Sequence, residues 1–297
     1  MDGAVKQLLE RIAMESTKTI IDFLNDYYEA ELHNIHDVAG NQHLLGYSKV
    51  YQTDIFVKIF TDEDMFDSEQ IINHEHYPDI YLDTVIFSNR FIVVLKDRKF
   101  KDNKVEDVDA EKAYEYGQLL ADFHKDLTGR ADVKRDSRTL KERALAGAAE
   151  LKDTDQYNTL QTLIEKLDPI FEKAELEYEM LPHVVMHGDF SVRNIKNYQG
   201  QDILIDFEWS QIGVAYEDMI KFFYSEVKDP ALRKAFLNGY RSKAQFEIPS
   251  QSLQQILLLL CAIKILIFHK EHKRRKFGSM ATDMLQTILD DDAVIRI

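Results

Sequence analysis

One stretch, residues 183–209, constrains this chain more than any other. Its sequence is HVVMHGDFSVRNIKNYQGQDILIDFEW. It contains two short apolar segments, 183–186 and 203–205, with the length and composition of buried strands. Between them, residues 197–200 (Asn-Tyr-Gln-Gly) have the composition of a turn. We therefore expect a paired hairpin or two adjacent short strands, each followed by a polar loop.

The loops after these two segments carry the chemically capable side chains. Asp189 follows the first segment, Asn194 comes five residues later, and Asp206 follows the second segment. Adjacent strands would bring all three side chains to one end of a small sheet. A carboxylate base beside an Asn/Asp pair that can hold a hard cation is what phosphoryl transfer from a nucleotide requires. The alternative is that these residues only form turns. The apolar segments that precede both loops argue against it.

Two further side chains of this stretch have predicted roles. We expect His187, two residues before Asp189, to brace the loop by hydrogen bonding rather than to react. Arg193, beside Asn194, has a guanidinium group that suits a transferred phosphate. It could equally make a surface ion pair, and the residues alone do not choose between these roles.

The composition narrows the class of protein. The chain has 297 residues, is 45% hydrophobic and 30% charged, and has a formal net charge of −15. This is typical of a globular, helix-rich protein with room for two domains. An acidic chain is a poor candidate for binding nucleic acid or an anionic membrane, and its charge mildly favours a cationic partner. The single cysteine, Cys261, excludes an intrachain disulfide and a Cys-based metal site.

No segment has the pattern of a signal peptide or of a helix that spans a membrane. Residues 1–18 are amphipathic and of mixed charge. The longest apolar run, residues 256–268, contains Lys264 and is too short to cross a bilayer, so we expect a buried helix there. The sequence thus predicts a soluble, cytoplasmic protein without a membrane or nucleic-acid partner, as a monomer or a homodimer.

Apolar periodicity predicts two domains of different character, an α+β fold. Residues 1–97 should form a small lobe with one or two leading helices and an antiparallel sheet, and residues 98–297 a larger, mainly helical lobe with one small sheet. In the first lobe we expect strands at 43–51, 53–60, 81–88 and 90–95, and a helix from Ser68 to about His76. In the second lobe we expect helices at 110–129, 139–152, 154–180, 216–226, 230–240, 253–275 and 279–289.

The motif HGDFSVRN followed by ILIDFEW resembles the aminoglycoside phosphotransferase and choline kinase superfamily, which has a two-lobed protein-kinase-like fold. The resemblance is strongest over residues 183–220, and the order of elements agrees over nearly the whole chain. It implies that Asp189 is the catalytic base and that Asn194 and Asp206 are Mg²⁺ ligands. It also implies that Asp218 buttresses the catalytic region, where the alternative is an exposed helix acid.

In the N-terminal lobe the resemblance implies a nucleotide site. Lys58, within the apolar strand 55–60, matches the lysine that contacts the nucleotide phosphates. A lysine in such a strand needs an acidic partner, unless the strand is an edge strand from which its ammonium group reaches water. We expect this partner to be Glu69, with Glu75 as the alternative.

The other nucleotide contacts are expected in the same lobe. The phosphate-covering loop would be Gly46-Tyr47-Ser48-Lys49, which has one glycine where protein kinases have several. Backbone contacts and the Ser48 hydroxyl would then replace the close approach that glycines permit. The adenine would lie against Val94, Leu95 and Lys96.

These features together predict a small-molecule kinase that uses ATP or GTP with Mg²⁺. The acceptor would be a hydroxyl of a small, cationic molecule such as an aminoglycoside, an amino sugar or choline. The alternative is a pseudokinase-like regulator that binds nucleotide without catalysis. A protein kinase is disfavoured because Asp206-Phe207-Glu208 replaces Asp-Phe-Gly and no Ala-Pro-Glu segment follows.

Three side chains near this stretch have open roles toward the acceptor. Trp209, the only tryptophan, could stack on the acceptor or simply pack. Glu208 and Glu217 could receive an ammonium group or could be solvated acids. The sequence does not identify the acceptor.

Overall fold

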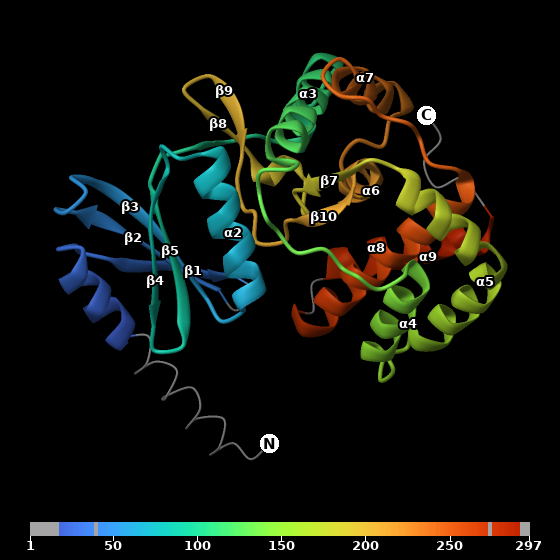
Figure 1. Ribbon diagram of the computed structural model, residues 1–297, viewed down its shortest axis with the longest axis horizontal. Helices are drawn as coiled ribbons and strands as arrows, with labels where there is room; N and C mark the ends of the chain where they lie inside the picture. The colour runs from blue at the N-terminus through green and yellow to red at the C-terminus, as the bar shows by residue number, and fades with distance from the viewer. Residues whose placement is uncertain (1–17, 39–40, 273–274, 292–297) are drawn as a thin grey trace. The chain divides into compact units, whose positions relative to one another are not determined.

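A computed structural model describes residues 18–38, 41–272 and 275–291. The chain divides into two compact units, residues 1–99 and 100–297 (Figure 1). The first is built on an antiparallel sheet and the second is mainly helical. The predicted α+β fold class is confirmed, and the division falls just beyond the predicted boundary at residue 97.

The first unit contains a five-stranded antiparallel sheet in the order β1-β2-β3-β5-β4. The strands are β1 (His33–Val38), β2 (Asn41–Ser48), β3 (Thr53–Phe60), β4 (Tyr81–Phe87) and β5 (Arg90–Lys96). The inner strands β3 and β5 are rich in β-branched and aromatic residues, which favour strands. β1 lies outside the predicted strands because its sequence, HNIHDV, lacks the apolar alternation that indicates a strand.

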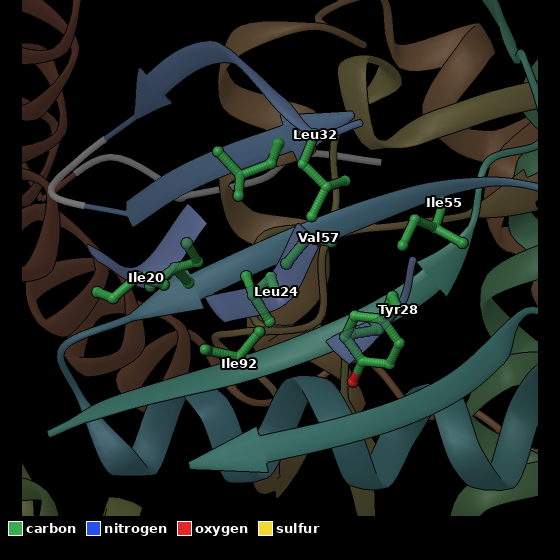
Figure 2. Close-up of a cluster of buried hydrophobic side chains, with 10 residues drawn as sticks. Ile20, Leu24, Tyr28, Leu32, Ile55, Val57 and Ile92 are labelled. Atoms are coloured by element: carbon green, nitrogen blue, oxygen red, sulfur yellow. The ribbon is translucent and has the colours of Figure 1, made fainter. Parts of the chain in front are cut away.

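The two faces of this sheet are covered by different helices. A helix described over residues 18–27 contributes Ile20 and Leu24 to a core that also holds Val57 and Ile92 (Figure 2). On the other face, the helix α2 (Glu63–His76) contributes Phe66 to a separate core with Phe60, Val93 and Leu95. Successive residues of a strand point to opposite faces, so β3 and β5 serve both cores. The rest of the predicted leading helices, residues 4–17, lies outside the described residues.

α2 begins earlier than the sequence predicted. Asp62 is its N-cap, and the Asp62 side chain accepts a hydrogen bond from the Met65 backbone N–H at 3.0 Å. Ser68, the predicted N-cap, is a buried residue inside the helix. Glu63 and Asp64, which precede Ser68, are in the first turn of the helix, where acids are favourable.

The second unit is organised around the apolar helix α8. Its helices are α3 (Ala110–Leu127), α4 (Leu140–Glu150), α5 (Tyr157–Met180), α6 (Ala215–Ser225), α7 (Pro230–Arg241), α8 (Gln251–His272) and α9 (Arg275–Leu289), with short 3₁₀ turns η1 (Val105–Asp107) and η2 (Val192–Asn194). α8 contacts α4, α5, α6 and α9. Among the described residues, it is the one helix long and apolar enough to cross a membrane, and 61% of its apolar window is buried within the protein. The prediction of a buried helix is confirmed, whereas the expectation that this segment is too short to cross a bilayer is not met, because the helix extends beyond the apolar run 256–268.

Two small sheets complete this unit. β7 (His183–Met186) pairs with β10 (Gln211–Val214), and β8 (Ile195–Tyr198) pairs with β9 (Gln201–Leu204) and β6 (Lys101–Asp102). The segment 183–186 is β7, as predicted, and residues 203–204 lie in β9, whereas Ile205 follows that strand. β7 and β9 belong to different sheets, so the expected pairing within one small sheet is wrong. The turn between β8 and β9 uses Gln199 and Gly200, both with positive φ, which suits a tight hairpin.

Candidate functional site

The loop between β7 and β8, residues 187–194, carries the predicted base. Gly188 has a φ of +81°, and a Cβ there would lie 2.0 Å from the backbone oxygen of Trp209. Glycine is required on both counts, since other residues are strained at this φ and no side chain fits. The chain therefore turns sharply against the segment that follows Asp206. The turn η2 then returns Asn194 toward Asp189.

Asp189 is held by two cations and one amide. Its Oδ2 accepts hydrogen bonds from Arg193 Nη2 at 2.5 Å and from Asn194 Nδ2 at 3.2 Å. Its Oδ1 accepts from Lys221 Nζ on α6. The Asp189 side chain is 12% exposed, so the carboxylate is within reach of a ligand but largely desolvated.

The charges around Asp189 decide its protonation. Burial raises the pKa of this carboxyl, but the attraction of Lys221 and Arg193 outweighs burial, so the pKa lies below its ordinary value. Asp189 is therefore ionised at neutral pH. It can accept a hydrogen bond, and then a proton, from a hydroxyl group.

Asn194 is buried, and its amide nitrogen is used inside the loop. Nδ2 donates to the backbone oxygen of Asp189 at 2.9 Å, in addition to its bond to Asp189 Oδ2. The side-chain oxygen is the atom that a hard cation would need. The loop thus orients Asn194 with its donor toward Asp189 and leaves the carbonyl for another role.

Asp206 is tied to the same loop through its neighbour Ile205. Ile205 N donates to the backbone oxygen of Asn194 at 3.0 Å, and Ile205 O accepts from His187 Nε2 at 3.0 Å. His187 Nδ1 also accepts from the backbone N–H of Asp189 at 3.3 Å. His187 therefore braces the loop by hydrogen bonding. These bonds connect the loop to the Asp206 segment although β7 and β9 belong to different sheets.

Asn194 and Asp206 have side-chain oxygens that could bind a cation whose other ligands come from phosphate groups and water. Among the described residues, no three His, Cys, Asp or Glu side chains gather into a metal cluster. One amide oxygen and one carboxylate hold Mg²⁺ when phosphate oxygens and waters supply the remaining ligands. The donor set therefore fits a nucleotide-bound Mg²⁺ and does not fit an all-protein metal site.

Asp218, at the start of α6, supports the loop from within the protein. Its Oδ2 accepts from the backbone N–H of His187 at 2.8 Å and from His124 Nε2 at 2.9 Å, and its Oδ1 accepts from Gly188 N–H at 2.8 Å. The Tyr240 hydroxyl lies 2.8 Å from His124 Nδ1. Asp218 is buried, so the alternative of an exposed helix acid is wrong.

The pKa of Asp218 is also lowered. Burial raises it, but the hydrogen bond and charge of His124 and the backbone N–H of His187 outweigh burial. A carboxylate that accepts several hydrogen bonds from fixed donors remains ionised even when buried. Asp218 thus acts as a permanent acceptor that fixes the loop backbone.

Lys221 contacts Asp189, but the sequence motif does not include it. It lies one helical turn after Asp218 on α6, and that spacing is the only signal that places it near the loop.

Glu217, considered as an ammonium receptor or a solvated acid, is neither. Its carboxylate accepts from Arg143 Nη2 at 3.0 Å and from the Tyr178 hydroxyl at 2.9 Å, and the Arg143 side chain is only 8% exposed. The side chain of Trp209 is half exposed beside the loop.

In the first unit, Lys58 forms a buried ion pair. Its Nζ lies 2.9 Å from Glu69 Oε1 of α2, and the two side chains are 7% and 1% exposed. Asn73 Nδ2 donates to the same Glu69 oxygen at 3.0 Å. Lys58 belongs to β3, between β2 and β5, so it is not on an edge strand. Glu69 is therefore the ion-pair partner of Lys58, whereas Glu75 contacts His74.

The assignment of Ser48 to a phosphate-covering loop is wrong. Ser48 is fully buried, and its hydroxyl donates to the backbone oxygen of Tyr28 at 2.8 Å. In the β2–β3 register, Ser48 is opposite Thr53, whereas His43 is opposite Lys58. Residues 46–49 thus lie at the far end of the hairpin from Lys58. The loop at the Lys58 end connects β1 to β2, and its residues 39–40 lie outside the described residues.

The predicted contact of Val94 with the nucleotide is also wrong. Val94 pairs with Val57 on the sheet face covered by the helix of residues 18–27, and its side chain is fully buried in that core. Its backbone is in register with Asp83 on the other side. Leu95 is opposite Phe56 and belongs to the face that carries Lys58. Of the two hydrophobic candidates, only Leu95 shares a face with Lys58.

Comparison with known families agrees with this site. The sequence model of the Phosphotransferase enzyme family matches residues 95–250, more than half of the 297-residue chain and all of the loop described above. The chain belongs to this family and is, by that membership, a small-molecule kinase. Among curated proteins, no significant sequence match is found.

Solved structures show the same fold. The chain is similar to choline kinase LicA from Streptococcus pneumoniae, with a TM-score of 0.66, 14% identity, and coverage of 93% of this chain and 98% of that one. It is similar to aminoglycoside phosphotransferase APH(4)-Ia, with a TM-score of 0.64, 12% identity, and coverage of 93% and 99%. It is also similar to the amicoumacin kinase hAmiN in complex with AMP-PNP, Ca²⁺ and Ami, with a TM-score of 0.60, 12% identity, and coverage of 90% of each chain. The fold is therefore the predicted protein-kinase-like one.

Proposed function

We propose that this protein transfers the γ-phosphate of ATP or GTP to a hydroxyl group of a small molecule, with Mg²⁺ bound beside the nucleotide. The observation that carries the proposal is the arrangement around Asp189. This ionised carboxylate lies within hydrogen-bond distance of Asn194 and Arg193, on a loop fixed from within by Asp218. Phosphoryl transfer needs little beyond such positioning and charge neutralisation.

Asp189 would orient the acceptor and take its proton. The acceptor oxygen forms a bond to the γ-phosphorus, and the bond between that phosphorus and the diphosphate oxygen breaks. The nucleoside diphosphate leaves with the bonding electron pair, and the hydroxyl proton passes to the Asp189 carboxylate. Arg193 would neutralise charge on the transferred group, because a guanidinium ion matches phosphate oxygens in geometry.

Each unit, taken by itself, carries residues to which we assign a role toward the nucleotide. Asn194 and Asp206 would bind Mg²⁺, which neutralises phosphate charge when bound. Lys58, fixed by Glu69, would contact the phosphates, and Leu95 the base. The structure of the amicoumacin kinase hAmiN, which shares the fold, is a complex with AMP-PNP, Ca²⁺ and Ami, which supports nucleotide and divalent-cation binding here.

A nucleotide-binding regulator without catalysis is the second candidate. No observation favours it over the enzyme, because the carboxylates and the amide are all present and Asp189 is held ionised. The family membership and the loop geometry do not identify the acceptor. The net charge of −15 mildly favours a cationic one.

We expect Asp189→Asn to reduce turnover by about 10²- to 10⁴-fold, the usual range for removing a general base. Release of nucleoside diphosphate, measured over a panel of amino alcohols, sugars, aminoglycosides and hydroxy acids, checks this. Nucleotide binding should be retained, since the change is isosteric. Asp168→Asn is the matched control, because Asp168 pairs with Lys141 on the surface of the same unit. Full activity of Asp189→Asn would exclude the proposed role.

A further inference from the structure

The loop 187–194 lies along one stripe of α6 and its C-cap residue. The stripe consists of three residues spaced four positions apart, which places them on one face of a helix: Asp218, Phe222 and Glu226. They contact the loop in chain order. The first accepts from the N–H groups at the start of the loop, and the second packs on Phe190, with ring centroids 4.9 Å apart. The third accepts from the Val192 backbone N–H at 2.7 Å.

Glu226 takes the place of a local helix cap. Val192 begins η2, and the first N–H groups of a helical turn have no partner within the turn. The residue before it, Ser191, is of a type that usually caps such a turn, but its side chain makes no capping hydrogen bond. The acceptor is instead Glu226, 34 residues further along the chain. The shape of η2 therefore depends on where α6 ends.

The end of α6 that carries Glu226 is itself held by α7. Arg233 of α7 donates from Nε to Val227 O at 2.8 Å and from Nη2 to Phe223 O at 2.9 Å. The last carbonyl groups of a helix have no internal partner, and a cation is favourable beside them. Arg233 therefore fixes this end of α6, and Glu226 reaches the loop from a fixed backbone.

The turn η2 carries the two side chains to which the proposed function assigns the transferred phosphate and the metal. Arg193 and Asn194 are its second and third residues, and both donate hydrogen bonds to Asp189. The charge of Glu226 also acts on Arg193. Burial lowers the pKa of this guanidinium, but the attraction of Asp189, Asp206 and Glu226 outweighs burial and raises it. A change in the backbone of η2 would move both side chains together.

We propose that Glu226 is a positioning residue of this site. Its hydrogen bond to Val192 sets the backbone of η2, and thereby directs Arg193 and Asn194 toward Asp189. The hydrogen bond does the positioning, and the charge of Glu226 is secondary. Glu226 acts through η2 and takes no part in the bond changes. The inference rests on the proposed function for what the two side chains do, but not for how they are held.

Two variants separate the hydrogen bond from the charge. Glu226→Gln keeps a side-chain oxygen that can accept from the Val192 N–H, whereas Glu226→Ala removes it. The matched control is Glu175→Ala, because Glu175 accepts from the Leu140 backbone N–H at 2.6 Å and is also partly buried. If Glu226 only stabilised the fold, its loss would have the same effects as the loss of Glu175.

Amide hydrogen exchange of the nucleotide-free, full-length protein tests the positioning without turnover. NMR measures the exchange rate of the Val192 N–H relative to the amides of α3, which corrects for changes in global stability. A hydrogen bond to a charged group is among the stronger ones, so Glu226→Ala should raise this relative rate by about 10- to 100-fold. Glu226→Gln should raise it by less, and Glu175→Ala should not change it. An unchanged relative rate in Glu226→Ala would overturn the proposal.

A kinetic arm tests the consequence for the reaction. Nucleoside diphosphate release is measured with ATP, Mg²⁺ and the acceptor that the wild type uses best. Residues that orient metal ligands commonly change activity by about 10- to 100-fold, and we expect Glu226→Ala to lower kcat by such a factor. The acceptor KM should change little, because Asp189 stays in place. Glu226→Gln should keep most of the wild-type kcat, and Glu175→Ala all of it.

The two arms also separate this inference from the proposed function. Equal kcat values in Glu226→Ala and Glu175→Ala, or a Glu226→Gln variant as impaired as Glu226→Ala, would overturn the positioning role. If the wild type releases no diphosphate with any acceptor, the proposed function fails. The exchange rate of Val192 then decides by itself whether Glu226 holds η2.

Discussion

Two aspartates define the loop 187–194, and their hydrogen-bond partners differ in kind. Asp189 belongs to the loop itself, whereas Asp218 contacts the loop from α6. Asp218, inside the protein, accepts hydrogen bonds from two backbone N–H groups and from the buried imidazole of His124. Asp189, on the accessible side, is held by the long side chains of Lys221 and Arg193. Both carboxyls have lowered pKa values, so the charge state is the same and the difference is in the partners.

This comparison shows how one loop can be rigid and reactive at once. Backbone donors cannot leave Asp218 unless the loop itself changes shape, so Asp218 fixes the backbone. Lys221 and Arg193 are 23% and 53% exposed, and their flexible stems let them turn from Asp189 to a bound ligand. Asp218 is therefore a structural acceptor, and Asp189 is an acceptor that can exchange its partners.

The largest effect that tests this difference is on stability. Asp218→Ala leaves a buried histidine and two backbone N–H groups without their acceptor, and we expect a loss of about 3–5 kcal/mol in the free energy of unfolding. Asp189→Ala should cost about 1 kcal/mol or less, because its cationic partners can turn to solvent. Urea unfolding of both variants checks this. Equal losses would show that the two aspartates are held alike.

A smaller effect is expected in acid. Depressed folded pKa values mean that each carboxylate adds stability that is complete above its unfolded pKa of about 3.9 and is lost as pH falls through its folded pKa. Stability should therefore hold down to about pH 4 and fall below it. Lys221→Met should raise the pKa of Asp189 and move that part of the loss to higher pH, while Asp218 is unaffected.

Urea midpoints measured between about pH 3 and pH 7 on wild type, Lys221→Met and Asp218→Asn separate the two contributions. Asp218→Asn should flatten the acid limb, because its side chain no longer titrates. An acid limb that is the same in all three proteins would show that neither carboxyl contributes to it.

The smallest effect concerns Ser191 on the same loop. Its buried Oγ has no hydrogen-bond partner among the described residues, whereas the buried Ser210 Oγ donates to His187 O at 3.2 Å. Ser191→Ala should be neutral or stabilising by up to about 1 kcal/mol, and Ser210→Ala should destabilise by about 1 kcal/mol. Thermal unfolding of the Ser191→Ala and Ser210→Ala variants measures this difference in stability. A greater loss of stability in Ser191→Ala than in Ser210→Ala would contradict the prediction.

Local patterns in the sequence predicted the elements well. The apolar spacing predicted a helix at 110–129, and α3 spans Ala110–Leu127. The segment 183–186 is the strand β7. Such signals depend on residues close in sequence. Pairing does not, so the β7–β10 and β8–β9 pairs were not predicted, and β8, with the sequence IKNY, has too little apolar character to indicate a strand.

The site shows the same limit. The motif identified Asp189, Asn194 and Asp206, because the spacing of these residues is itself the signal. Lys221 lies 32 residues from Asp189, and only the packing of α6 on the loop brings them together. Ser48 was misplaced for a related reason. The sequence indicated a hairpin with a glycine, but not which end of that hairpin lies beside Lys58.

Trp209 gives this site an optical label of its own. It is the only tryptophan of the chain and lies three residues after Asp206. The residue is half exposed, and its backbone oxygen packs against Gly188. Its intrinsic emission therefore originates from one known place beside the loop. Events at Asp206 and at the loop can thus be followed in the unmodified protein, without attaching a dye and without waiting for turnover.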